Sequence, residues 1–178
     1  MFFKAVIVVF CCLIFFSKAV AQSNQTEWKT SIYSDGRFSV KLPCQPIGFT
    51  QGPKFHVGGL VLNSFHMGCR RNDHKKFSVT RIQYKKSSAS APAADSYFEN
   101  ISRNKKWQVV GAKIVRGRFQ DYPVLDISIR KSDQCFDARY ILATPELFVL
   151  SVEAMDNKCE GLSALTAEFF PSLIFGAR

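Results

Sequence analysis

The N-terminal part of the sequence contains an unbroken apolar run, Ala5–Phe16. This run indicates which part of the chain belongs to the folded domain and in which compartment that domain folds. Lys4 precedes the run, and small residues ending at Ala21 follow it, so the sequence predicts a secretory signal over residues 1–21 that is cleaved after Ala21. As a helix the run would span only about 18 Å, which is too short for a membrane anchor. We therefore expect the mature protein in the periplasm or outside the cell, with no transmembrane segment.

The remaining residues have the size and composition of one globular domain. The full sequence of 178 residues is 47% hydrophobic and 21% charged, close to the globular average, which excludes a wholly disordered chain. We expect residues 22–27 to form a flexible terminus and residues 28–178 to form a single domain. This domain stays strongly basic, because the signal removes only Lys4 and Lys18 from a formal net charge of +10.

Four cysteines remain after signal removal, at Cys44, Cys69, Cys135 and Cys159. Paired cysteines are the default in an oxidising compartment, so we expect two disulfides. A turn at Thr144–Glu146 would fold the strand-like runs on either side into a hairpin and bring Cys135 near Cys159. This geometry favours Cys135–Cys159 and, by elimination, Cys44–Cys69. Each bond would close a loop of roughly 25 residues and contribute about 3 kcal/mol.

A metal or redox role is the alternative for these cysteines. The sequence has no Cys-x-x-Cys pair of the kind that thioredoxin-like sites use. His66 and Cys69 have the spacing of two metal ligands, with His74 and Cys44 as further candidates for a zinc site. We expect disulfides instead, and the sequence predicts no metal site and no cofactor.

Apolar and polar residues alternate along several segments, which is typical of half-buried strands; Arg37–Leu42 is the clearest case. A Gly- and Pro-rich stretch up to Gly59 predicts a loop, and apolar positions three to four apart predict helices over Ala93–Lys106 and Glu160–Leu173. The other predicted strands are Trp28–Tyr33, Leu60–Cys69, Phe77–Tyr84, Gln108–Phe119, Tyr122–Arg130, Cys135–Thr144 and Leu147–Ala154. The sequence thus predicts an α+β fold, a disulfide-braced antiparallel sheet flanked by two main helices.

Short motifs in the chain resemble one family. The segment Asp35–Pro43 is similar to a recurrent start of small exported bacterial domains. Further on, Gly111 leads a strand, Asp121–Pro123 makes a turn, and Arg139 precedes an apolar strand. This order resembles the PsbP/Mog1-like fold over about Trp28–Phe175. The resemblance implies an antiparallel sheet flanked by helices in an accessory or binding protein, and it brings no catalytic residues to this chain.

The motifs of the common hydrolases, zinc proteases and nucleotide-binding enzymes are missing. The chain lacks G-x-S-x-G, H-E-x-x-H, a Walker loop and G-x-G-x-x-G. His56, His66 and His74 are each candidates for a general base, so an enzyme with a histidine-based site near His66 or His56 is one alternative. Surface and edge histidines are commoner than catalytic ones, and we predict a non-enzymatic protein.

Basic residues supply the strongest functional signal, and they crowd the turn and the strand that follow Cys69. The predicted binding patch consists of Arg70, Arg71, Lys75, Lys76, Arg81, Lys85 and Lys86. Such a patch would bind a polyanion such as lipopolysaccharide, an acidic glycan or an anionic lipid, whereas nucleic acid is not expected. A solvated hairpin tip is the alternative interpretation. The sequence therefore predicts an exported binding or accessory domain whose partner is an anionic surface or another exported protein.

Overall fold

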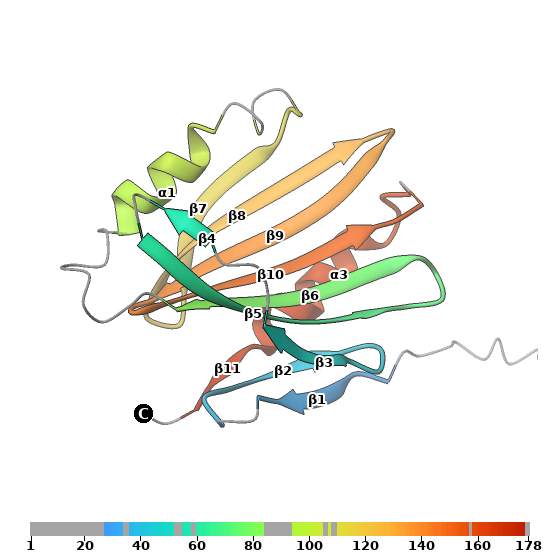
Figure 1. The fold of residues 1–178 in the computed structure, drawn as a ribbon. Helices are drawn as coiled ribbons and strands as arrows, with labels where there is room; N and C mark the ends of the chain where they lie inside the picture. Colours follow the sequence, from blue (N-terminus) through green and yellow to red (C-terminus); the bar gives the residue numbers. More distant parts are fainter. Residues whose placement is uncertain are drawn as a thin grey trace, which may run out of the picture.

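Two antiparallel sheets dominate the fold (Figure 1). The computed structural model describes residues 27–33, 36–51, 55–57, 60–83, 94–104, 107, 110–156 and 158–176. The predicted signal peptide, most of the predicted flexible terminus, and the candidates Lys85 and Lys86 lie outside these ranges. The elements are β1 (Lys29–Ile32), β2 (Phe38–Leu42), β3 (Ile47–Gln51), β4 (Phe55–Val57), β5 (Leu60–Arg70), β6 (Lys75–Gln83), α1 (Ala94–Ser102), β7 (Lys113–Phe119), β8 (Tyr122–Lys131), β9 (Gln134–Ala143), β10 (Glu146–Ala154), α3 (Leu162–Phe169), the 3-10 helix η1 (Phe170–Ser172) and β11 (Ile174–Phe175).

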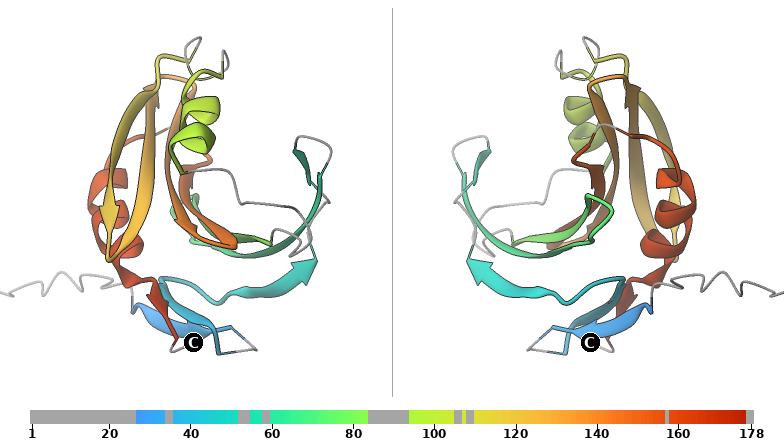
Figure 2. Two further views of the ribbon diagram at one scale, coloured as in Figure 1. Left: turned by 90° about the vertical axis from the view of Figure 1, so that its left-hand side faces the viewer. Right: turned by 90° about the vertical axis from the view of Figure 1, so that its right-hand side faces the viewer.

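The larger sheet has the strand order β3-β5-β6-β10-β9-β8-β7, with β4 paired to β5, and the smaller sheet has the order β1-β2-β11. Figure 2 shows that the larger sheet is strongly bent, with α1 inside the bend and with α3 and the smaller sheet outside it. We call the inner side of the larger sheet the concave face and its outer side the convex face.

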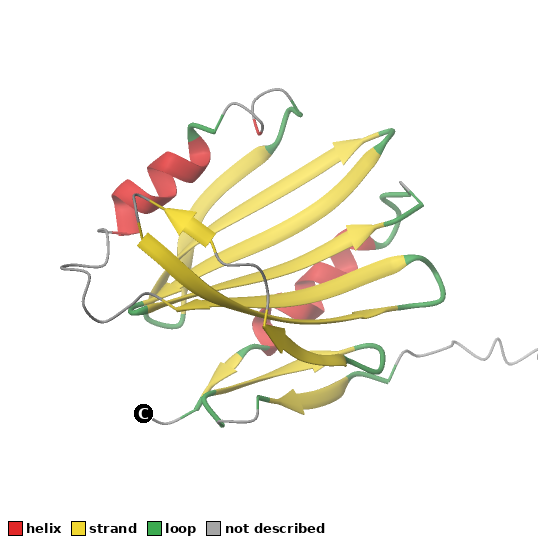
Figure 3. Cartoon of the chain, in the orientation of Figure 1, coloured by secondary structure: helices red, strands yellow, loops and turns green. Residues whose placement is uncertain are grey.

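The predicted α+β class with two main helices is wrong, because the fold is mostly β, with 58% of the described residues in strands and 15% helical (Figure 3). Strands β3 and β4 lie in the stretch that was expected to be a loop. Its Gly and Pro residues weaken the local strand signal, and pairing with β5 supplies the backbone hydrogen bonds instead. Strand β11 was likewise not predicted, because a two-residue strand has no readable alternation.

The two helices are shorter than expected. Helix α1 ends at Ser102 rather than at Lys106. Helix α3 ends at Phe169 and continues as η1, which contains Pro171. Proline lacks a backbone N–H donor, so an α-helix does not continue through it without losing a hydrogen bond.

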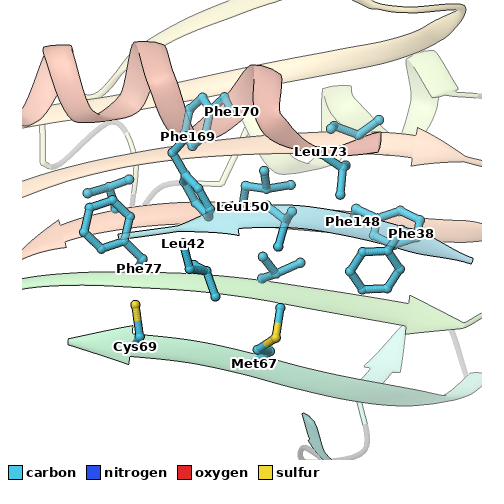
Figure 4. Packing of buried hydrophobic residues seen from close by; sticks show 14 of the residues in the cluster. Phe38, Leu42, Met67, Cys69, Phe77, Phe148, Leu150, Phe169, Phe170 and Leu173 are labelled. Carbon is cyan, nitrogen blue, oxygen red and sulfur yellow. The ribbon is translucent and has the colours of Figure 1, made fainter. Parts of the chain in front are cut away.

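The main core lies on the convex face (Figure 4). Alternate residues of the central strands point into it, such as Phe77 of β6 and Leu150 of β10, both fully buried. Strand β2 contributes Phe38 and Leu42 from the smaller sheet, and α3 contributes Phe169, whose ring makes an edge contact with Phe77. The smaller sheet and α3 are therefore held to the larger sheet by apolar burial.

A second core lies on the concave face beneath α1. Phe98 of α1 packs with Leu125 and Ile127 of β8 and with Leu147 of β10. Toward β5 the same face becomes polar, since His66 of β5 and Ser78 and Thr80 of β6 lie there in place of apolar side chains. The concave face thus has an apolar part under α1 and a polar part at β5 and β6.

The predicted disulfide pairing is confirmed. Cys44 and Cys69 are bonded with a Cα–Cα distance of 5.7 Å, and Cys135 and Cys159 with one of 5.2 Å. Strands β9 and β10 form the hairpin that the pairing argument assumed, with Cys135 opposite Ala154. Within the described ranges no helix combines the length and apolar character needed to cross a membrane. Both findings are compatible with an exported protein.

Candidate functional site

Strand alternation divides the predicted basic patch between the two faces of the larger sheet. Successive side chains of a strand point to opposite faces. Lys75 and Arg81 share the parity of Phe77 in β6 and belong to the convex side, whereas Lys76 belongs to the concave side. These residues therefore do not form one surface.

Arg81 is a buried structural residue rather than a surface cation. It is only 1% exposed, and its guanidinium carbon lies 5.2 Å from the ring centre of Tyr33 and 5.9 Å from that of Phe65. Its Nε donates a hydrogen bond to Glu146 Oε1 at 3.1 Å, and Arg37 reaches the same oxygen at 3.2 Å. This burial and pairing keep Arg81 from contacting a ligand in solvent.

Lys75 and Arg71 are also engaged by the protein itself. Lys75 is 5% exposed, and its Nζ donates to the carbonyl of Lys158 at 2.8 Å and pairs with Asp156 at 3.3 Å. Arg71 pairs with Asp73 at 3.1 Å. Their charges are therefore largely compensated within the fold.

Arg70 and Lys76 are brought together. They are direct cross-strand partners in the β5–β6 ladder, and both line a hollow of about 340 Å³ at the end of the concave face. Like charges placed directly opposite each other destabilise a strand pair. On its other side Lys76 lies opposite Glu153 of β10, but these two side chains form no ion pair in the structure. An anion in the hollow would relieve the repulsion between Arg70 and Lys76.

The hollow is a product of the pairing between β3 and β5. Its other lining residues are Ile47, Gly48, Thr50, His66, Gly68, Cys69 and Met155. The β3–β5 register shifts between Ile47 and Thr50, and both of these residues line the hollow. A Cβ on Gly68 would lie 2.8 Å from the carbonyl oxygen of Phe77, so only glycine fits there, and it leaves no side chain on the floor. The Cys44–Cys69 bond fastens the chain just before β3 to β5.

His66 is the histidine that lies at the hollow. Its Nδ1 is 3.0 Å from Thr80 Oγ1, in a hydrogen bond whose direction depends on the tautomer. Burial lowers the pKa of His66 from its ordinary value of 6.5, and the nearby charge of Lys76 lowers it further. The imidazole is therefore neutral at pH 7. His74 instead lies in the β5–β6 turn beside Arg70, and the side chain of His56 falls outside what the structure describes.

A second hollow, of about 290 Å³, lies between α3 and strands β8 and β9. Its charges are paired: Arg130 with Asp137 at 2.7 Å and Arg139 with Asp126 at 2.8 Å. Thr166 of α3 also donates to Asp137 at 2.8 Å, so this network fastens α3 to the sheet. Sequence spacing did not identify these pairs, because their members are brought together by the β8–β9 ladder.

No cluster of three or more metal-binding side chains occurs in the part of the chain that the structure describes. The candidates Cys44 and Cys69 for a zinc site are bonded to each other. Sequence reasoning found Arg70, Lys76 and His66 but missed Ile47 and Met155, because neither lies in a recognisable motif. No family model matches the chain, and no curated protein or solved structure is significantly similar to it.

Proposed function

We propose that this protein is an exported, non-enzymatic binding domain that holds an anionic ligand in the hollow between β3, β5 and β6. The supporting observation is that Arg70 and Lys76 face each other across the β5–β6 ladder and line the same hollow. The described residues that line it include no carboxylate. Glu153 of β10 lies opposite Lys76 but is not part of this wall, so the wall itself carries positive charge.

This proposal narrows the predicted polyanion-binding patch to two of its described members. Arg81, Lys75 and Arg71 have partners within the fold, as shown above. Arginine offers a planar pair of donors and lysine a compact charge, and together they suit a sulfonate, phosphate or carboxylate group. The hollow has a volume near the lower end of the range for ligand pockets, about 300 Å³.

The test compares two double variants of equal charge. Arg70→Glu/Lys76→Glu reverses the two cations of the hollow, and Lys41→Glu/Lys113→Glu reverses two exposed lysines on β2 and β7, away from it. We expect the first variant to leave a heparin column at a clearly lower salt concentration than the second. Equal elution of the two variants would show that retention depends on net charge alone and would overturn the proposal.

A further inference from the structure

The rim of the hollow carries apolar side chains that an anion by itself does not require. Five large apolar side chains are strongly exposed among the described residues: Ile32, Ile47, Val115, Met155 and Ile174. Two of them line this hollow, Ile47 at 72% and Met155 at 47% exposure. Single exposed apolar residues are normal on a protein surface, but these two come from separate chain segments and line the same hollow as Arg70 and Lys76.

The backbone holds this rim in place. Met155 follows β10, and its N–H donates to the carbonyl of His74 at 2.8 Å in the β5–β6 turn. Ile47 is the first residue of β3 and pairs with Gly68 of β5. The Cys44–Cys69 disulfide also ties the segment before Ile47 to β5. Ile47 and Met155 are therefore both held by the backbone of neighbouring segments.

We infer that the ligand is a single-chain anionic amphiphile, with its head group between Arg70 and Lys76 and its hydrocarbon chain against Ile47 and Met155. This inference rests on the proposed function and adds the chemical class of the ligand. The hollow has room for a head group and the first part of a chain, about 340 Å³ in all. Each methylene buried against the rim strengthens binding by about fourfold.

The experiment uses alkyl sulfonates, whose single charge does not change with pH. Methanesulfonate, hexanesulfonate and decanesulfonate are titrated below their micelle-forming concentrations into the mature, oxidised protein. Binding is followed through the amide NMR signals of Gly68 and Lys76. We expect decanesulfonate to bind at least roughly tenfold more tightly than methanesulfonate, which corresponds to about two buried methylenes. Decyltrimethylammonium, with the same chain and the opposite charge, is expected not to shift these signals.

Two further variants distinguish the contribution of the ligand's hydrocarbon chain to binding from that of its head group. Ile47→Ser/Met155→Ser is expected to bind methanesulfonate like the wild type and to lose the gain with chain length. Ile32→Ser/Ile174→Ser removes two exposed isoleucines from the smaller sheet and is the matched control, expected to keep that gain. Equal loss of the gain in both variants would overturn the inference.

The outcomes distinguish the inference from the function on which it rests. If methanesulfonate and decanesulfonate bind equally, and Arg70→Glu/Lys76→Glu abolishes both, the anion site stands and the amphiphile is refuted. If that variant binds both sulfonates as the wild type does, the anion site itself is refuted. If the protein binds vesicles of phosphatidylglycerol tightly but binds none of the monomeric sulfonates, the inferred amphiphile is refuted and the ligand is a membrane surface instead.

Discussion

Lys75 and Lys76 are consecutive residues of β6, and their side chains lie on opposite faces of the larger sheet. Lys75 donates to the carbonyl of Lys158 at 2.8 Å and is 5% exposed, whereas Lys76 lines the hollow on the concave face. Lys75 therefore stabilises the fold, whereas Lys76 belongs to the proposed binding site. The two positions offer a matched pair of substitutions.

We expect Lys75→Ala to lower the free energy of unfolding by about 1–2 kcal/mol, because it removes the buried ammonium group that donates to the carbonyl of Lys158 and pairs with Asp156. Lys76→Ala is expected to leave stability within about 0.5 kcal/mol of the wild type and to weaken sulfonate binding. Urea unfolding and the NMR titration measure the two effects. The same stability loss in both variants would contradict the assignment of the two lysines to different faces.

Arg81 and Glu146 form a deeply buried ion pair on the convex face, with side chains 1% and 14% exposed. We expect Arg81→Ala to destabilise the protein by about 3 kcal/mol, because it leaves Glu146 without its main partner and empties the space between Tyr33 and Phe65. The double variant Arg81→Met/Glu146→Leu removes both charges and is expected to recover much of this loss. Urea unfolding measures both variants, and a single variant as stable as the wild type would refute the structural role.

Asp137 makes stability depend on pH in the acid range. Burial alone would raise its pKa, but hydrogen bonds from Arg130, Thr166 and Ser128, together with the charge of Arg130, lower the pKa below its ordinary value of 3.8. A group whose pKa is lowered in the folded state stabilises the fold above its unfolded value, about 3.9, and loses that contribution as the pH falls through the folded value.

We therefore expect Asp137→Asn to be about 2 kcal/mol less stable than the wild type at pH 7. The difference should shrink as the pH falls below about 4, because Asp137 becomes protonated there in the unfolded wild type and, at lower pH, in the folded protein as well. Urea unfolding at pH 7, 4 and 3 gives the comparison. A difference that stayed constant over this range would show that the ionised form of Asp137 is not what stabilises the fold.

His66 makes ligand binding depend on pH near neutrality. Its pKa is lowered by burial and by Lys76, so the imidazole is neutral in the free protein at pH 7. A bound anion favours the protonated form, and sulfonate affinity should therefore rise several-fold as the pH falls from 7.5 to 5. The other groups near His66 from β6, β3 and β5 are Lys76, Thr80, Thr50 and Arg70.

Glu153 of β10 is a carboxylate that lies opposite Lys76, and its charge also acts on an anion in the hollow. The variants His66→Asn and Glu153→Gln separate these two groups. We expect the pH dependence between 7.5 and 5 to disappear in His66→Asn and to persist in Glu153→Gln. The reverse result would assign the dependence to Glu153.

The two disulfides close loops of nearly equal length, with sequence separations of 25 and 24. Removing either should therefore cost a similar amount of stability, about 3 kcal/mol. Only Cys44–Cys69 fastens the β3 wall of the hollow. We expect Cys44→Ser/Cys69→Ser to lose sulfonate binding and Cys135→Ser/Cys159→Ser to keep it, in conditions where both remain folded. Equal affinities would show that the wall does not need this bond.

Part of this fold could be predicted from local sequence patterns. The alternation in β2 and β6 and the hairpin of β9 and β10 were readable because they depend on neighbouring residues. The hairpin in turn allowed the cysteine pairing to be derived. Strands β3, β4 and β11 were missed because they owe their conformation to pairing partners on other segments, which no local window contains.

The sequence by itself determined that the chain is basic and that Arg70 and Lys76 are charged, and it favoured the cysteine pairing that the structure has. Only the tertiary structure decided that these two side chains face each other beside Ile47 and Met155, while Arg81 is buried against Glu146. The reason is physical: alternation along a strand sets which residues share a face, but the neighbours across that face come from strand pairing over long distances in the chain.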